Sequence, residues 1–199
     1  MSSKFSPGTD YILEDDWVLI RPLTTNDYKN LLPFALYEPS TWRYSPVGAQ
    51  GADGLRNYMD IALKGKLEGT EYPFIIYDKK TGEYAGSTRF YDIQPVNQAL
   101  EIGYTWYGEK FRGTGLNKHC KFLLLQLAFD ELDMKRVGFR ADARNDRSIA
   151  AMKSIGCTVE GIIRSHLLLP DGSRRDSILL SILQHEWQQE VKARLKVRL

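Results

Sequence analysis

The order of the expected secondary structure predicts an α+β fold, in which a mixed β-sheet carries helices. A strand-like run and two segments with helical apolar spacing come first, ending near Leu67. Three strand-like runs joined by turn residues follow, between Tyr72 and Tyr107. Helical and strand-like segments then alternate up to Leu183, which adds strands to the sheet. We see no repeat or linker, so we expect a single domain over 1–199 with its core at about 17–184.

The composition is that of an ordinary globular protein. Hydrophobic residues make up 43% of the 199 residues, charged residues make up 26%, and the formal net charge is +2. A charge so near zero argues against a nucleic-acid or membrane partner, and no apolar run approaches the roughly 20 residues of a membrane span. The N-terminus lacks the apolar core of a signal peptide. We therefore expect a cytoplasmic protein, either a monomer or a homodimer.

The two cysteines, Cys120 and Cys157, stand alone in the sequence. They belong to no C-x-x-C pair and to no cluster of cysteines and histidines. The sequence therefore predicts neither a disulfide framework nor a metal site.

The first part of the chain predicts one strand and two helices. Residues 17–23 alternate enough to form a strand. The polar residues 24–27 start a helix that Pro39 closes, because the residue before a proline disfavours the helical conformation. A second helix is expected over 53–67, after a loop.

Three strands are expected next, over 72–78, 83–93 and 100–107, the first two joined by a hairpin turn that ends in Gly82. On the third strand, side chains should alternate between the two faces of the sheet. One face would carry Glu101, Gly103, Thr105 and Tyr107, and the other Leu100, Ile102, Tyr104 and Trp106.

A glycine-rich loop, Phe111-Arg-Gly-Thr-Gly-Leu-Asn117, lies between the third strand and a helical segment from Lys118 to Leu132. Its two glycines allow a tight bend and a close approach to a ligand. The first N–H groups of a helix have no partners inside the helix, and the helix dipole places about half a positive charge there. This combination predicts an anion site, most often one for phosphate.

Two common phosphate loops do not fit this stretch. A P-loop needs a lysine where Thr114 stands, and a dinucleotide loop needs a third glycine where Lys118 stands. A turn with no ligand is the remaining alternative on these residues alone.

The rest of the chain predicts a strand, a short helix, a hairpin and a tail. The strand covers 136–144, and Asp146 or Asn145 caps a short helix that runs through Ile155 and is ended by Gly156. The hairpin strands cover 158–169 and 176–183. The hairpin turn is Pro170-Asp-Gly-Ser173, and the tail over 185–199 is expected to be helical and basic at its end.

Four segments share their sequence pattern and their order with a known superfamily. They are Leu100–Tyr107, Arg112–Asn117, Arg140–Ser148 and Ile155–Gly161. They resemble the GCN5-related N-acetyltransferases (GNAT), and among them the ribosomal-protein-alanine acetyltransferase (RimJ/RimL-like) branch, over about residues 17–184. Only Asn117 departs from the Arg/Gln-x-x-Gly-x-Gly/Ala signature. The resemblance implies a splayed sheet of about seven strands with helices on both faces, and acetyl-CoA as co-substrate.

The resemblance also implies where the cofactor binds. In this superfamily the pantetheine arm lies between two parallel strands, here 99–107 and 136–144, and pairs with the backbone of the first. Trp106 and Tyr107 would then lie beside the cofactor. The pyrophosphate would bind backbone N–H groups of Arg112, Gly113, Thr114, Gly115 and Leu116, with a side-chain donor from Asn117. The Arg112 side chain either adds charge at the phosphates or lies on the surface.

Two residues match positions near the thioester in this branch. Asn145 stands where relatives place an asparagine that contacts the cofactor, and it would equally suit a helix N-cap. Ser148 matches a proposed general acid for the leaving thiolate, or is simply a serine in the first turn of a helix.

A base must deprotonate the ammonium group of the acceptor. Glu101 is the first candidate, because it lies on the strand beside the proposed thioester site. Its alternative role is an ion pair with Arg89 or Arg140. His166 is a second candidate by its chemistry, although a lone histidine is more often structural.

The acceptor pocket is expected to have an aromatic wall. Its candidates are Trp42, Tyr44, Phe90 and Tyr91 together with His166, although aromatic residues mostly belong to the core. A polyamine would need a cluster of carboxylates, and residues 40–60 offer only Asp53 and Asp60.

The resemblance implies a function in acetyl transfer. We expect an acetyl-CoA-dependent N-acetyltransferase that acts on a primary amine, either a protein N-terminus or a small molecule, by direct attack in a ternary complex. The alternative is a non-catalytic acyl-CoA-binding module that serves as a sensor. Glu101 and Ser148 together favour the enzyme, because a binding module needs neither an acid nor a base.

Overall fold

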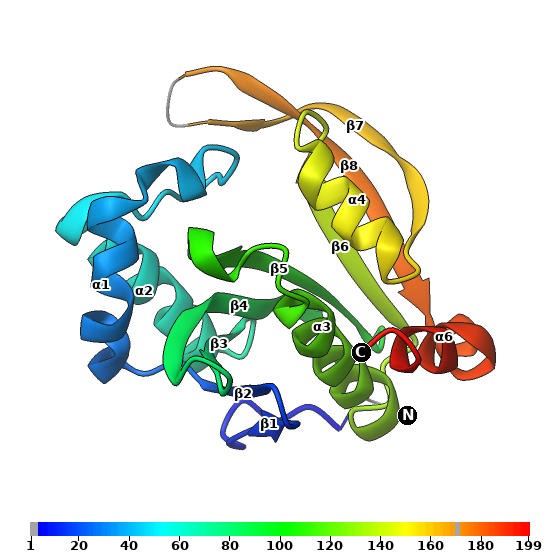
Figure 1. Cartoon of the computed structure of the whole chain (residues 1–199). Coiled ribbons are helices and arrows are strands. Elements are labelled where there is room, and N and C mark those ends of the chain that lie inside the picture. The colour runs from blue at the N-terminus through cyan, green and yellow to red at the C-terminus, as the bar shows by residue number, and fades with distance from the viewer. Residues whose placement is uncertain (1–3, 170–171) are drawn as a thin grey trace.

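A mixed sheet of eight strands runs through the computed structural model, which describes residues 4–169 and 172–199 (Figure 1). The strand order is β1-β2-β3-β4-β5-β6-β8-β7. β5 and β6 are parallel, and the other described neighbours are antiparallel. The strands are β1 (Leu13–Glu14), β2 (Val18–Pro22), β3 (Tyr72–Asp78), β4 (Glu83–Gln94), β5 (Ala99–Tyr107), β6 (Arg136–Asp142), β7 (Thr158–Leu168) and β8 (Arg174–Leu183).

The predicted α+β fold is confirmed, and seven of the eight strands lie within two residues of their predicted limits. The exception is β1, whose two residues are too few to show a periodic pattern. The predicted hairpin turn at 170–173 lies partly outside the described residues. Its flanks are closed by hydrogen bonds from Leu169 N to Ser173 O and from Gly172 N to Leu169 O.

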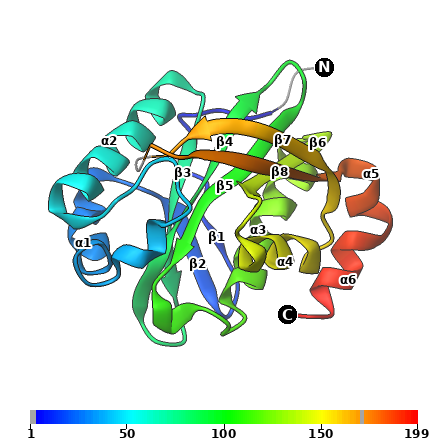
Figure 2. The ribbon, with the colours of Figure 1, turned by 90° about the horizontal axis from the view of Figure 1, so that it is seen from above.

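Helices cover both faces of the sheet (Figure 2). On one face, α1 (Tyr28–Tyr37) and α2 (Gly51–Glu68) enclose a smaller apolar cluster. On the other, α3 (Leu116–Gln126) and α4 (Asp146–Ser154) contribute to the main core. Short helical turns lie between these elements at Thr25–Asp27, Pro39–Trp42, Glu109–Phe111 and Leu127–Glu131. Over 4–169 and 172–199, no helix is long and apolar enough to cross a bilayer.

The C-terminal segment is helical, as predicted, and it belongs to the hydrophobic core. It consists of α5 (Gln184–Glu186), a π-helical turn at Trp187–Val191 and α6 (Lys192–Lys196). Trp187 is 0% exposed and packs against Phe122 and Phe129, at ring-centroid distances of 5.8 and 5.7 Å. The core therefore extends beyond the predicted limit at residue 184.

The central strands β5 and β6 stay paired for only three residues each. Their register joins Ala99 to Arg136, Leu100 to Val137 and Glu101 to Gly138, and no pairing is found beyond that point within the described strands. The two halves of the sheet then diverge (Figure 1). We call the opening between residues 102–107 of β5 and 139–142 of β6 the wedge. This is the splay that the family resemblance implied.

The predicted alternation of side chains along β5 is wrong after Gly103. Tyr104 has a φ of +49°, and the register with β4 shifts between Ser87 and Arg89, so that β5 gains one residue. Such a β-bulge reverses the faces that follow it. As a result Ile102 lies in the main core, whereas Tyr104 and Trp106 pack on the α1–α2 side.

A partly buried carboxylate ties the N-terminal segment to α3. Asp15 accepts hydrogen bonds from the backbone N–H groups of Trp17 and Val18, at 2.8 and 2.9 Å. Its other oxygen lies 2.7 Å from Nδ1 of His119, whose ring stacks on Trp17. Burial alone would raise the pKa of Asp15, but these hydrogen bonds hold it below its ordinary value.

We expect Asp15→Asn to lower the free energy of unfolding by about 1–2 kcal/mol at pH 7, because it removes a charged hydrogen-bond acceptor. A depressed carboxylate pKa stabilises the fold above the unfolded-state value, near 4, and this contribution is lost as the pH falls through the folded-state value. Urea unfolding at pH 7 and pH 3 measures the difference, which should shrink at pH 3. The exposed Asp16→Asn is the matched control; an equal loss in both variants would contradict the prediction.

Candidate active site

The loop before α3 presents backbone N–H groups beside the wedge. Gly113 and Gly115 have φ values of +77° and +97°, which L side chains rarely adopt, and the space where their Cβ atoms would lie is open. The N–H of Arg112 already donates to Glu109 O at 3.2 Å. Among the residues that the structure describes, the N–H groups of Gly113, Thr114 and Gly115 have no acceptor. These three donors are the ones that an anion could bind.

The Arg112 side chain is folded back onto the protein. Its Nε donates to the carbonyl oxygen of Tyr107 at 2.9 Å, and one terminal nitrogen donates to Thr41 Oγ1 at 2.7 Å. Burial, followed by the nearby charge of Arg147 on α4, lowers the pKa of Arg112. Two guanidinium groups therefore lie close to the starts of α3 and α4, and the charge of Arg112 is partly offset by Glu109, whose carboxylate lies 3.8 Å away.

The other residues predicted beside the cofactor divide between the two faces of the sheet. The Tyr107 hydroxyl donates to Asn117 Oδ1 at 3.2 Å, which links the end of β5 to the first turn of α3. Trp106 lies on the opposite face, where its Nε1 donates to the Tyr58 hydroxyl at 3.3 Å. The predicted alternation already separated these two neighbours, and the β-bulge determines which face each of them occupies.

The start of α4 borders the wedge from the side of β6. Asn145 is the N-cap of this helix, since its Oδ1 accepts the backbone N–H of Ser148 at 3.1 Å. The N-cap role is therefore confirmed, and a contact of Asn145 with the cofactor stays a prediction. Ser148 is partly buried in the first helical turn, as its alternative role also required.

Glu101 stands where β5 and β6 part. One carboxylate oxygen accepts the Tyr91 hydroxyl and the other pairs with Arg140, while the absence of a side chain at Gly138 leaves room for it. The ion pair with Arg140 was one of the two alternatives for this residue. The other, Arg89, pairs instead with Glu71 at 2.7 Å. Both oxygens of Glu101 are thus engaged.

A second group of residues supports the β-bulge from the α2 side. The guanidinium of Arg89 lies between the rings of Tyr58 and Tyr104, at 4.5 and 4.0 Å from their centroids. The Tyr58 hydroxyl donates to the carbonyl oxygen of Tyr104 at 3.2 Å. These contacts hold Tyr104 in its left-handed conformation. A tyrosine and an arginine at unrelated sequence positions carry no motif that could have revealed this role.

Polar side chains of β6 and β8 line one face of the sheet next to the wedge. We call the group formed by the side chains of Arg140, Asp142, Arg175 and Ser177, the last three of which are buried, the polar face. The β6–β8 register places Asp142 beside Ser177. His166 of β7 joins it, with Nδ1 at 2.9 Å from Ser177 Oγ. Burial and the charges of Arg140 and Arg175 lower the pKa of His166, which favours a neutral imidazole.

The predicted aromatic wall is only partly assembled. Phe90 is 0% exposed and packs on Phe74 in the main core, so it is not a wall residue; its strand position faces α3. Trp42 is buried against Trp106 on the α1–α2 side. Tyr44 reaches the polar face, because its carbonyl oxygen accepts a hydrogen bond from Arg175 at 3.1 Å.

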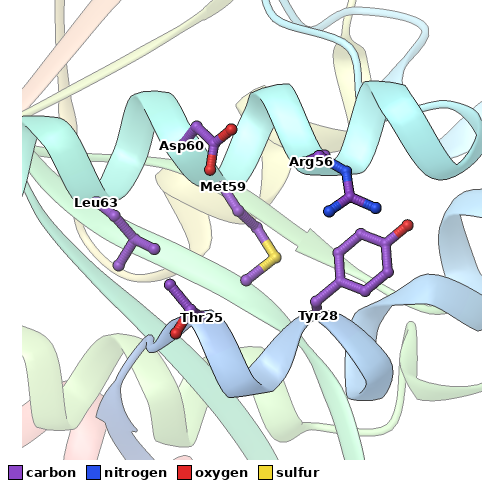
Figure 3. A pocket seen from close by; sticks show the side chains of 6 residues that line it. All are labelled: Thr25, Tyr28, Arg56, Met59, Asp60 and Leu63. Atoms are coloured by element: carbon purple, nitrogen blue, oxygen red, sulfur yellow. The ribbon is translucent and has the colours of Figure 1, made fainter.

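Two small pockets lie near these elements. One of about 140 Å³ opens between α1 and α2, and none of its lining residues comes from the wedge (Figure 3). The other, about 160 Å³, is lined by Arg43, Tyr44, Arg144 and Leu169, and two of these residues contact the polar face, Arg144 through Asp142 and Tyr44 through Arg175. We associate the second with the site because it contains Tyr44. Over 4–169 and 172–199, no cluster of metal-ligating side chains is found.

The family of this chain follows from a profile match. The family described as "Acetyltransferase (GNAT) domain" matches residues 18–158, more than half of the chain. The chain belongs to the GNAT acetyltransferase family. The predicted resemblance is therefore confirmed, and with it acyl transfer to an amine as the class of reaction.

Individual GNAT proteins agree with this assignment. The "Putative ribosomal N-acetyltransferase YdaF" of Bacillus subtilis is 33% identical over 69% of each chain. A crystal structure of a "putative acetyltransferase" from T. thermophilus is 32% identical, with a TM-score of 0.86 over 96% of this chain and 98% of that one. RimJ of Mycobacterium smegmatis, solved in complex with CoA-disulfide, is 21% identical, with a TM-score of 0.77 over 100% and 97%, and shows the shared GNAT fold.

We expect Glu101→Gln to lower the free energy of unfolding by about 2 kcal/mol, because it leaves the partly buried Arg140 without its counter-ion. Urea unfolding measures this loss. The control is Glu131→Gln, a change at an exposed carboxylate, which should stay within about 0.5 kcal/mol of the parent. Unchanged stability together with lost turnover would show instead that Glu101 acts in the chemistry and not in the fold.

Proposed function

We propose that this GNAT protein transfers an acetyl group from acetyl-CoA to a primary amine by direct attack in a ternary complex. The observation that carries the proposal is the set of N–H groups of Gly113, Thr114 and Gly115, which lack acceptors within the described chain, at the start of α3 and beside the wedge. Backbone donors at a helix start suit a pyrophosphate, and the open edge of β5 suits an extended amide chain. These features support binding of the pyrophosphate and the pantetheine arm of acetyl-CoA.

Each part of the site has a separate task in this proposal. The loop N–H groups would bind the pyrophosphate, and Arg112 and Arg147 would add positive charge nearby. Asn117 and Asn145 would orient the cofactor from the first turns of α3 and α4. Acetyl-CoA supplies the activated thioester, and the chain contributes position, because holding two reactants together accounts for much of the acceleration of such reactions.

Two proton transfers accompany acetyl transfer. The acceptor ammonium must lose a proton before its nitrogen attacks, and Glu101 and His166 are the candidates to take it, directly or through water. The departing sulfur is protonated as the carbon–sulfur bond breaks, and the proposed donor is the Ser148 hydroxyl. Both Glu101 oxygens already interact with Tyr91 and Arg140, so we favour the neutral His166 as the base.

A second candidate is a non-catalytic acyl-CoA-binding module. The specific observation in its favour is the engagement of Glu101 by Tyr91 and Arg140, which occupies the carboxylate that β5 would offer as a base. Turnover of any amine by the purified protein distinguishes the enzyme from the module.

The remaining sequence-based expectations belong to the same proposal. We infer a single domain over 1–199 in the cytoplasm that acts without a metal, as a monomer or a homodimer. No nucleic-acid or membrane partner is part of it. The ribosomal substrate named for the RimJ/RimL-like branch is one possible acceptor, because relatives of this superfamily act on different amines.

Calorimetric titration of the purified protein with acetyl-CoA tests the proposal, with CoA and ATP as comparison ligands. We expect micromolar binding of acetyl-CoA and none of ATP. Folded protein that binds no CoA species would exclude both the enzyme and the module.

Gly115→Glu should weaken CoA binding by about 100-fold or more, because it places a carboxylate at the anion site. Gly115→Ala is the matched control, since either residue at a φ of +97° carries a similar backbone cost of roughly 1–2 kcal/mol. Calorimetry on both folded variants separates charge from strain. Equal affinities for CoA would remove the loop from the pyrophosphate site.

Ser148→Ala should lower kcat by about 10- to 100-fold while changing the Kd for CoA much less, because the hydroxyl would act only as the thiolate leaves. A thiol-release assay at saturating substrates measures kcat. Ser154→Ala, at the far end of α4, is the control variant. An unchanged kcat in Ser148→Ala would exclude this residue as the acid.

A further inference from the structure

Arg175 is a buried cation with only neutral hydrogen-bond partners among the described residues. Its residue is 5% exposed. Nε donates to Ser177 Oγ at 3.0 Å, and a terminal nitrogen donates to the carbonyl oxygen of Tyr44 at 3.1 Å. Over 4–169 and 172–199, no carboxylate oxygen lies within 4.0 Å of its guanidinium. Burial lowers the pKa of Arg175, and the more distant Asp142 offsets this effect only in part.

Neighbouring arginines do not share this environment. Arg89 pairs with Glu71, Arg140 with Glu101 and Arg144 with Asp142. A buried guanidinium is ordinarily matched by a carboxylate, because removing the charge from water is costly and neutral oxygens compensate for it poorly. Arg175 therefore has an unused capacity to bind an anion.

The position of Arg175 places this capacity at the wedge. It lies on the polar face, two residues before Ser177, which pairs with Asp142 of β6. Its hydrogen bond to the carbonyl oxygen of Tyr44 joins β8 to the segment that follows the Pro39–Trp42 turn, and this turn packs against β5 on the other half of the sheet. The pocket of about 160 Å³ lies beside Tyr44, the residue whose carbonyl oxygen Arg175 holds, and Arg43 and Arg144 line that pocket.

We propose that Arg175 binds a carboxylate of the acceptor, so that the acceptor is an amine that also carries a carboxylate. This inference rests on the proposed acetyltransferase function. A carboxylate can accept two hydrogen bonds from the planar guanidinium, which gives both affinity and orientation. With the carboxylate held by Arg175, the amine of the same molecule would extend toward Tyr91 and Tyr104, where β5 bends into the wedge.

The same face argues against a polyamine as acceptor. A polyamine needs unpaired carboxylates, but Glu101 and Asp142 are already engaged by Arg140 and Arg144. Arg175 would add repulsion between like charges. Two sources of a carboxylate-bearing amine remain, namely a free amino acid and a peptide with an acidic residue near its N-terminus.

Matched acceptors test this inference through thiol release. Each set contains an amino acid, its amide and its decarboxylated amine; peptides with an acidic or an amide side chain at position two form a separate arm. We expect a kcat/KM about 10- to 100-fold higher for the carboxylate member, in the range of a charge-assisted hydrogen bond. The arm with the larger preference identifies the source. Equal rates for carboxylate and amine members would overturn the inference while leaving the acetyltransferase function intact.

Two variants show whether Arg175 is responsible. Arg175→Met should reduce the preference to less than about threefold, and Arg175→Lys should keep part of it, since a lysine retains the charge but not the fork of donors. The matched control is Arg174→Met, which removes an exposed guanidinium from the preceding position of β8. A full preference in folded Arg175→Met would overturn the inference. If the methionine variant does not fold, an undiminished preference in Arg175→Lys would overturn it.

A binding measurement separates this inference from the proposed function. The acceptors are titrated calorimetrically against the protein, with and without CoA. We expect the carboxylate member to bind more tightly than its amine, and this difference to disappear in Arg175→Met. Lack of CoA binding would contradict the acetyltransferase function, yet the carboxylate titration would still decide the role of Arg175. A carboxylate that binds no better than its amine would overturn that role.

Discussion

The short pairing of β5 with β6 is the constraint on which the rest of the structure depends. Three residues of each strand are joined, the last pair being Glu101 and Gly138, and the strands then separate. A sheet that parts in its middle leaves the ladder groups of one strand without a partner, which is costly unless water or a ligand replaces it. The two glycines of the loop before α3 direct further N–H groups to the same place. The opening of the sheet and the proposed anion site therefore lie next to each other.

Two polar networks stabilise the halves of the sheet on either side of this opening. On the β4–β5 side, Arg89 and Tyr58 hold the β-bulge at Tyr104. At the vertex, Glu101 joins Tyr91 to Arg140 and so connects the two halves. Buried charges of this kind add little net stability compared with apolar packing, but losing one partner is expensive. We infer that they fix the geometry of the opening more than they strengthen the fold.

Sequence patterns predicted the fold well, because most segments are periodic and are bounded by glycine, proline or capping residues. The loop before α3 and the N-cap at Asn145 were also local features. The errors arose where distant residues decide the outcome. The β-bulge at Tyr104 reversed the faces of Tyr104 and Trp106, and Phe90 followed its strand into the core, which no local pattern on those strands indicated. Arg175 was missed because its role depends on the lack of a carboxylate partner among the described residues, which only the structure reveals.

The distribution of charge on the polar face connects these points to specificity. On the proposed cofactor side of the site, the candidate ligands are backbone N–H groups, which suit any acyl-CoA. Acceptor recognition needs side chains, and on this face the carboxylates already have arginine partners, while one buried arginine has no carboxylate partner among the described residues. A ligand with a carboxylate can form the charge-assisted hydrogen bonds that this arginine does not make within the described chain. We therefore infer the chemistry of the ligand from how the neighbouring arginines are paired. It is an anion with planar oxygen acceptors, such as a carboxylate.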